Sequence, residues 1–495
     1  MTLKAKEQIM FKKLKLLGAL FVTGFLLLLP STSQSKEANP HRFTANAMAP
    51  LIIESKQGWQ EFETQLAIAK EIGVDAISVD VWWGLAEKEA DNQFDWQYYD
   101  KIFSVIDKAG LNIVAIMSLH RCGGYEGDAC NYPVPKWVWN NYKAQGLNKK
   151  DLMYIGENGA MNDEFVSLWQ DDIIVPQYVE FMSEFQSHFS KYENKIDEIN
   201  ISLGPSGELR YPSYNPRDPL CAYPTRGCFQ AYSKSAIESF RKFVIQKYSS
   251  LKEINNSWKR PKKLTDFNQI LPPIDSPKST GLAKNFINEN RHMTTQYGKD
   301  FTRWYHQSLV EHGERLIRAS FNSFDKEFKS IPLGVKLAGI HWLMSPKAPI
   351  PRAAEMAVGT IFASDKLYSR DFGYGYRSIM EMLNEVNKTR LVFLHFTNLE
   401  GDDLDVVNGE RTYSMARTQV NYVATAANDL SVPLKGENAM GFGVESEHGW
   451  NNIEDSFKRN NFSGITVLRV ENITRNEIGK SRMKKFIAHK KQSSE

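Results

Sequence analysis

The feature that most constrains the fold of this chain is a repeated alternation of two kinds of segment. Eight short apolar runs with strand character recur along the sequence, at residues 43–51, 75–81, 112–118, 198–203, 333–340, 391–397, 432–437 and 465–470. Amphipathic helical patterns separate them, at 58–72, 98–109, 175–192, 231–248, 297–328, 376–386 and 416–428. Strands that alternate with helices form a parallel sheet. Eight such units predict an α/β fold, a closed (β/α)8 barrel of the TIM type.

The 495 residues exceed the usual length of such a barrel, so some of its loops must be long. The two largest excursions, residues 121–172 and 208–333, each follow the end of a predicted strand. Barrel enzymes build their active sites from the loops at the carboxyl ends of the strands. We therefore expect these long loops to form the active-site face.

Polar side chains recur at the ends of seven of the predicted strands. They are Asp80, His120, Glu208, Lys336 with His341, Thr397, Glu437 with Asn438, and Arg469. A structural role could explain any one of them, but burying so many polar groups is costly unless they meet partners or a ligand. The pattern predicts a polar pocket that holds two carboxylates, Glu208 and Glu437.

Glu208 stands just past a strand end, after the chain breakers Gly204, Pro205 and Gly207 and close to Tyr211. A carboxyl group against aromatic faces is poorly solvated, which raises its pKa and suits a general acid. The alternative is a loop glutamate in a turn. Two carboxylates in a polar pocket are typical of a glycoside hydrolase, and the sequence alone leaves both inversion and retention open.

Residues 1–35 have the pattern of a secretory signal peptide. Three lysines precede an apolar run at 16–29, and Pro30 and small residues follow it. We expect cleavage after Ser33 or Ser35 and a secreted protein, extracellular or periplasmic, with an uncleaved membrane anchor as the alternative. The sequence then predicts a catalytic domain at 36–475, a solvated basic tail at 476–495 and no stable membrane span after processing.

Loss of residues 1–33 takes away five lysines and one glutamate, which lowers the formal net charge from +3 to −1. A near-neutral protein is not built to hold nucleic acid through counterion release. The four cysteines allow three connectivities. In an oxidising compartment we favour the local pairs Cys122–Cys130 and Cys221–Cys228 over zinc, because no CxxC spacing is present.

Five segments together resemble the β-amylase family. They read VDVWWG at 79–84, MSLHRCGG at 117–124, GPSGELRYPSY at 204–214, GIHW at 339–342 and GENA at 436–439. The resemblance keeps the family's order over nearly the whole span from 43 to 470. It implies an inverting exo-hydrolase that releases β-maltose from the non-reducing ends of starch-like α-1,4-glucans.

The resemblance implies Glu208 as the general acid and Glu437 as the general base. The family's substrate contacts fall on Asp80, His120, Asp128, Lys336, His341, Thr397, Asn438, Ala439 and Arg469. Residues 123–128 correspond to a mobile lid that closes over the terminal sugars, here with an unusual Tyr125-Glu126 pair. No cofactor is implied for catalysis.

Bacterial members of the family often bind one structural calcium ion, which the resemblance places on Glu87, Asp91 and Glu180. Clustered carboxylates suit this hard cation, and solvated acidic side chains are the alternative reading. The short tail after 470 implies no C-terminal starch-binding domain. We therefore expect a monomer that acts on soluble starch, maltodextrin or glycogen.

Three rival hypotheses remain at this stage. A catalytically silent glucan-binding protein should have lost a glutamate or the lid, whereas Glu208, Glu437 and Asp128 are all present. A retaining β-glycanase would place its second glutamate differently. A membrane-anchored scaffold rests only on the apolar run at 16–29.

Overall fold

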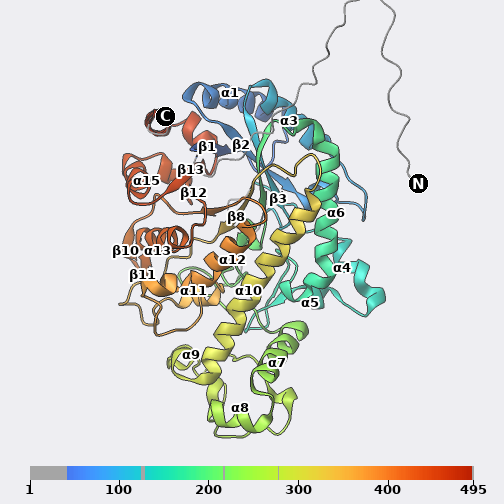
Figure 1. The fold of residues 1–495 in the computed structure, drawn as a ribbon, viewed down its shortest axis with the longest axis vertical. Coiled ribbons are helices and arrows are strands. Elements are labelled where there is room, and N and C mark those ends of the chain that lie inside the picture. The colour runs from blue at the N-terminus through green and yellow to red at the C-terminus, as the bar shows by residue number, and fades with distance from the viewer. Residues whose placement is uncertain (1–41, 124–128, 216–217, 277, 493–495) are drawn as a thin grey trace, which may run out of the picture. The chain divides into compact units, whose positions relative to one another are not determined.

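The computed structural model describes residues 42–123, 129–215, 218–276 and 278–492. Its centre is a closed barrel of eight parallel strands (Figure 1). These are β1 (Thr44–Met48), β2 (Ala76–Trp82), β3 (Asn112–Ser118), β6 (Ile196–Ile201), β8 (Leu333–Leu337), β9 (Val392–Phe396), β12 (Leu434–Glu437) and β13 (Phe462–Val467). Each pairs with the next in this order, and β13 returns to β1. All eight predicted runs overlap a barrel strand, so the predicted fold is confirmed.

The strands are nearly continuous apolar runs because both faces of this sheet are covered. In β1 the residue Ala47 pairs with Ile77 of β2 on one side and with Val467 of β13 on the other. Both neighbours are fully buried. This pattern is the one expected of parallel strands with helices packed outside them.

Helices surround the barrel. They include α1 (Lys56–Ile72), α3 (Gln97–Lys108), α6 (Asp171–Phe189), α10 (Gln296–Ser323), α12 (Arg377–Asn387), α13 (Ala416–Asp429) and α15 (Glu447–Arg459). In α1 the Ser55 side chain caps the first turn by accepting a hydrogen bond from the Gly58 backbone N–H. Phe62, Leu66 and Ala69 then fall on one face at helical spacing and are buried.

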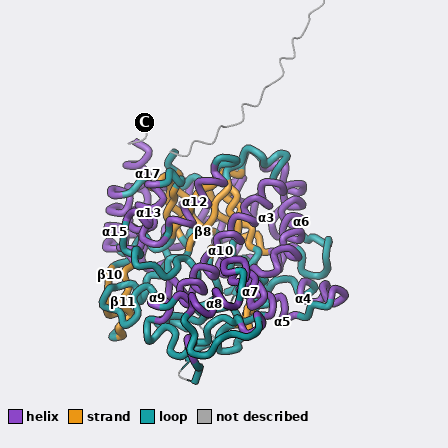
Figure 2. Tube along the Cα trace, turned by 60° about the horizontal axis from the view of Figure 1, so that its bottom comes forward, coloured by secondary structure: helices purple, strands orange, loops and turns teal. Residues whose placement is uncertain are grey.

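The long excursion after β6 carries α7 (Lys234–Tyr248), α8 (Leu251–Trp258) and α9 (Arg291–Thr294). In Figure 1 these helices gather at the lower end of α10, and the turned view of Figure 2 brings them forward together with much of the loop structure. The smaller elements are the two-residue strand β7 (Glu208–Leu209) and the hairpins β4–β5 (Tyr154–Ile155, Met161–Asn162) and β10–β11 (Asp403–Val407, Glu410–Met415).

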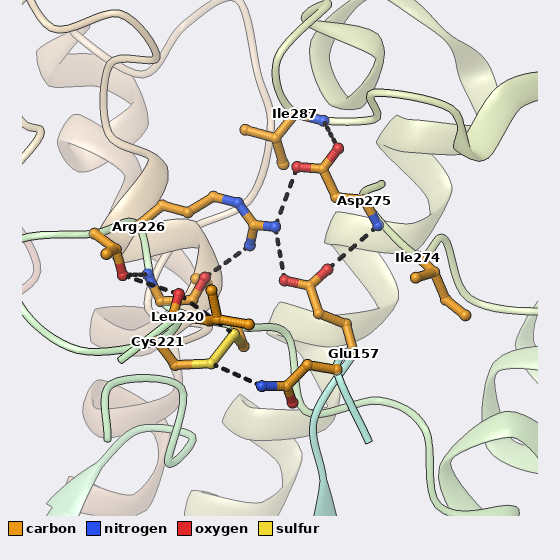
Figure 3. Close-up of polar contacts among 12 residues, drawn as sticks. Glu157, Leu220, Cys221, Arg226, Ile274, Asp275 and Ile287 are labelled. Carbon is orange, nitrogen blue, oxygen red and sulfur yellow. Dashed lines mark hydrogen bonds and ion pairs between the residues drawn. A yellow bond between two sulfur atoms is a disulfide. The ribbon is translucent and has the colours of Figure 1, made fainter. Parts of the chain in front are cut away.

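A buried ion cluster joins the two long excursions that the sequence places on the active-site face. Arg226 lies between two carboxylates, 2.6 Å from Glu157 and 3.1 Å from Asp275 (Figure 3). Close to it, Cys221 is bonded to Cys228, and the other disulfide joins Cys122 to Cys130. The predicted cysteine pairing is therefore the pairing in the structure.

The C-terminal segment differs from the solvated basic tail that the sequence predicts. Glu477–Gln492 forms helix α17, which buries Met483, Phe486 and Ile487. The ring of Phe486 packs against Phe43 at the start of the barrel, with 5.8 Å between the ring centroids. The lysines of this helix lie on its other faces, so their number concealed the apolar stripe. Over the described residues, no helix is both long and apolar enough to cross a bilayer.

Candidate active site

The described residues of the predicted pocket come from seven barrel strands, at or just beyond their carboxyl ends. Asp80 lies in β2, Lys336 in β8 and Glu437 at the end of β12. The remaining predicted contacts follow strand ends, namely His120 after β3, His341 after β8, Thr397 after β9, Asn438 and Ala439 after β12, and Arg469 after β13. Asp128 lies outside the described residues. Since parallel strands end at the same rim of a barrel, these side chains share one face.

Glu208 is positioned by a tight turn after β6. A Cβ on Gly204 would lie 2.7 Å from the backbone oxygens of both Glu208 and Arg210, so the turn requires glycine. The chain then pairs with β8, and Glu208 stands opposite Lys336 in the register. This strand pairing fixes the position of Glu208 at the rim of the barrel.

Burial raises the pKa of Glu208, as the sequence predicts, although its surroundings differ from the prediction. The ring of Tyr211 stacks on Tyr305 in the core, and a charged side chain, Arg210, contacts Glu208. Arg210 donates from Nε to Glu208 Oε2 at 2.9 Å, which lowers the pKa without cancelling the effect of burial. Glu208 therefore tends to keep its proton.

Glu437 has the opposite electrostatic surroundings. Burial alone would raise its pKa, but Lys336 and His395 outweigh burial and lower the pKa to about 2. Lys336 Nζ lies 2.9 Å from Glu437 Oε2, and His395 Nδ1 lies 3.1 Å from Glu437 Oε1. Two carboxylates whose pKa values are pushed apart in this way form the acid and base pair of many hydrolases.

Asp80 faces Ser118, which donates from Oγ to Asp80 Oδ1 at 2.8 Å. Burial raises the pKa of Asp80, and the positive charges of Arg469 and Lys336 oppose that rise. A buried carboxylate with cations nearby can accept hydrogen bonds from the hydroxyl groups of a neutral ligand.

The two predicted site histidines are uncharged near neutral pH. Burial lowers the pKa of His120 to about 3 and that of His341 to about 4. His120 Nδ1 lies 2.9 Å from Ser202 Oγ, and its ring meets Trp82 edge to face. A neutral imidazole has one donor and one acceptor nitrogen, which suits a ligand rich in hydroxyl groups.

The turn after β12 is held from two sides. Glu400 accepts hydrogen bonds from the backbone N–H groups of Ala439 at 2.9 Å and Met440 at 2.7 Å. Asn438 Oδ1 accepts one from the Leu468 N–H at 2.8 Å, which links this turn to the end of β13. Burial raises the pKa of Glu400, and its backbone donors oppose that rise.

Sequence reasoning missed five polar residues that support the site: Arg210, Glu198, His395, Lys435 and Glu400. Arg210 lies inside the segment 204–214, but the sequence pattern does not indicate that it contacts Glu208. His395 stands two residues before Thr397, which directly follows β9, and Lys435 stands two residues before Glu437 in β12. Because side chains alternate along a strand, that spacing places them on the same inner face and could have revealed them.

The carboxylates proposed for calcium also come together. Oxygen atoms of Glu87, Asp91 and Glu180 lie within 4.8 Å of one another. Glu87 is buried, and burial raises its pKa to about 7, with the neighbouring carboxylates adding to the rise. A set of crowded acidic oxygens fits the donor preference of a hard divalent cation.

Comparisons with known proteins agree with this geometry. The sequence profile described as glycosyl hydrolase family 14 matches residues 47–494. The thermophilic β-amylase of Thermoanaerobacterium thermosulfurigenes is 36% identical over 456 residues, which cover 92% of this chain and 75% of the relative. The β-amylase of Bacillus cereus is 36% identical over 455 residues, which cover 91% and 76%.

Among solved structures, the catalytic domain of the β-amylase from Paenibacillus polymyxa matches with a TM-score of 0.76 and 35% identity, over 91% of this chain and 99% of that one. A β-galactosidase from Marinomonas ef1, with a TM-score of 0.53 and 9% identity, shares the fold alone. The long match to the family profile and the relatives above 30% identity decide the assignment. The chain belongs to glycosyl hydrolase family 14.

Proposed function

We propose that this chain is a β-amylase, which hydrolyses α-1,4-glucosidic bonds in starch-like glucans and releases β-maltose from their non-reducing ends. The observation that carries this proposal is the pair of buried carboxylates, Glu208 and Glu437, whose pKa values are shifted in opposite directions. They stand at the strand ends of a barrel that belongs to family 14.

In the proposed reaction Glu208 is the general acid and Glu437 the general base. Protonated Glu208 donates its proton to the glycosidic oxygen as the bond to the anomeric carbon breaks. Ionised Glu437 takes a proton from a water molecule, whose oxygen attacks the anomeric carbon from the opposite face. The attack inverts the α-linkage, so the released maltose carries a β-hydroxyl group.

The polar rim supplies the proposed contacts to the sugar hydroxyl groups. Asp80 is an acceptor, Lys336 and Arg469 are donors, and the neutral imidazoles of His120 and His341 can do both. We assign Thr397, Asn438, Ala439 and the lid residue Asp128 to the same role. Soluble starch, maltodextrin and glycogen are the proposed substrates.

We propose further that one calcium ion binds at Glu87, Asp91 and Glu180. Carboxylate oxygens that crowd together repel one another, and a divalent cation removes that repulsion. The ion would hold the connection between β2 and α3, which carries Glu87 and Asp91, against Glu180 of α6 and take no part in the reaction. We also propose that residues 1–35 direct secretion and that the processed protein is a monomer.

The first experiment is to incubate the purified chain with soluble starch and follow the sugars by proton NMR from the first minutes. We expect β-maltose first, followed by mutarotation. Glu208→Gln and Glu437→Gln should each lower kcat by about 10²–10⁴-fold or more. Glu63→Gln, a change of an exposed glutamate on α1, is the matched control and should keep full activity.

The alternatives give different products. An α-anomer that appears first would mean retention, and mixed oligosaccharides would mean endo-cleavage. Glucan binding without any maltose would make the chain a binding protein on a hydrolase fold. Each of these results contradicts the proposed function.

A further inference from the structure

A row of four buried side chains with alternating charge, Lys435, Glu198, His395 and Glu437, lies in the barrel interior. Lys435 Nζ lies 2.6 Å from Glu198 Oε2, and the other oxygen of Glu198 lies 2.6 Å from His395 Nε2. His395 Nδ1 in turn lies 3.1 Å from Glu437 Oε1. This row of charges therefore connects β6, β9 and β12. It ends at Glu437, the proposed general base.

The two contacts of His395 determine its protonation state. A carboxylate oxygen can only accept a hydrogen bond, so Nε2, which is hydrogen-bonded to Glu198 Oε1, must carry a proton. Nδ1 lies 3.1 Å from Glu437 Oε1 as a charge contact without hydrogen-bond geometry. The imidazolium cation is the form of the ring that both carboxylates attract. A neutral ring would turn a lone pair towards one of the two carboxylates.

Burial makes each partner in this row of charges necessary for the stability of the others. His395 has no exposed surface, and the side chains of Glu198 and Glu437 are 2% and 5% exposed, so water cannot replace a lost partner. Removing one member of a buried charge pair is strongly destabilising because the other charge is left uncompensated. Lys336 on β8 and Lys435 on β12 are the register neighbours of His395, so carboxylates and cations alternate around it.

A glycine in β8 leaves space for the Glu198 carboxylate in this row of charges. A Cβ on Gly334 of β8 would lie 2.0 Å from Asn200 Oδ1 and 2.4 Å from Glu198 Oε1. Glycine at this position leaves the space into which the Glu198 carboxylate reaches. The same Glu198 oxygen is the one that contacts His395.

We propose that Glu198 and His395 are a positioning pair for Glu437, in which Glu198, anchored by Lys435, holds a cationic His395 against the general base. The inference rests on the proposed function and deepens it. His395 touches neither substrate nor water in this scheme. It fixes one oxygen of Glu437, while Lys336 holds the other, and its charge keeps the base ionised in acid.

The charge of His395 has a defined consequence for the pH profile. Its carboxylate neighbours raise the pKa of His395 despite burial, and His395 with Lys336 lowers the pKa of Glu437. A neutral residue at position 395 lets the pKa of Glu437 rise. Glu437 then takes up a proton at a higher pH, so the acid limb of the kcat/KM profile shifts to higher pH.

The test compares three variants of the whole chain. His395→Asn and Glu198→Gln should each move the acid limb of kcat/KM up by about one pH unit or more, with roughly tenfold lower kcat at pH 4 and a KM within about twofold. His306→Gln is the matched control, since His306 is equally buried but contacts the Gly359 carbonyl. It should leave the pH profile unchanged.

A second measurement does not depend on activity. In the chain labelled with ¹⁵N-histidine, the ring signals that disappear in His395→Asn should be those of a ring that keeps both N–H protons at pH 8. A neutral ring, or an unchanged acid limb in both variants, overturns the inference. Because the wild-type chain is assayed in parallel, absence of β-maltose would contradict the proposed function while leaving the NMR result to decide the charge of His395.

Discussion

At the scale of single residues, burial favours the protonated form of Glu208 at the expense of stability. Its folded-state pKa lies above the ordinary value of about 4.5, so the charged form is disfavoured in the folded protein. Below the unfolded pKa both states carry the proton and the site has no cost. As pH rises from the unfolded pKa to the folded pKa, the unfolded chain releases the proton first, so the folded state loses stability progressively until Glu208 ionises in it as well.

Glu208→Gln should therefore gain stability relative to the wild type between pH 4 and pH 7, because it removes the buried ionisable group while its amide oxygen can still accept from Arg210. We expect the melting temperature to rise by roughly 1–3 °C at pH 7, and the difference to shrink towards pH 4. Circular dichroism melts over this pH range measure it. A difference that stays constant from pH 4 to pH 7 would show that ionisation is not the cause.

Glu400 offers a second residue-scale prediction, because it holds the turn that presents Asn438 and Ala439. Glu400→Ala leaves two backbone N–H groups without their acceptor, which costs about 1–3 kcal/mol for each buried group. We expect KM for maltodextrin to rise about tenfold, with a smaller change in kcat. Glu400→Gln retains a carbonyl acceptor and should recover most of the affinity. Equal KM values in all three proteins would exclude this role.

At the scale of elements, the strands were easier to predict than the helix that closes the chain. Runs such as 112–118 are apolar throughout, because a strand inside a barrel is covered on both faces. Helix α17 shows a weaker pattern, in which Met483, Phe486 and Ile487 supply the apolar stripe among many lysines. Their spacing of three and four residues was the available signal, and the positive charge obscured it.

Truncating the central residue of that stripe tests the packing of α17. Phe486 lies with its ring centroid 5.0 Å from that of Phe457 and 5.8 Å from that of Phe43. Phe486→Ala should lower the free energy of unfolding by about 3–5 kcal/mol, measured by urea denaturation. Lys485→Ala, its exposed neighbour, should change it by less than about 0.5 kcal/mol. Similar values for the two variants would mean that the helix does not pack on the barrel.

At the scale of the whole molecule, the sequence predicts the barrel and its polar rim but not the connections within the rim. The polar rim could be predicted from the residues at the strand ends alone, because the parallel strands of a barrel end at the same face. The contact between His395 and Glu198 joins residues 197 positions apart. It depends on strand register and on the space left by Gly334, and neither is encoded in local periodicity.

Calcium binding is the prediction that concerns the stability of the whole molecule. A cation that binds only the folded protein stabilises it by mass action, by about 2.7 kcal/mol at a concentration 100 times its Kd. We expect CaCl₂ to raise the melting temperature of the chain and EDTA to reverse the rise. MgCl₂ should do less, because Mg²⁺ demands stricter geometry and gives up its water reluctantly.

The same measurement on variants locates the ion. Glu180→Gln removes the half-buried carboxylate that α6 contributes to the cluster, and Glu184→Gln, one turn further along and also half-buried, is its matched control. Calcium should no longer raise the melting temperature of Glu180→Gln but should still raise that of Glu184→Gln. If calcium stabilises both variants equally, the ion binds elsewhere. If it stabilises none of the proteins, the three carboxylates are a solvated acidic cluster and the proposed site is wrong.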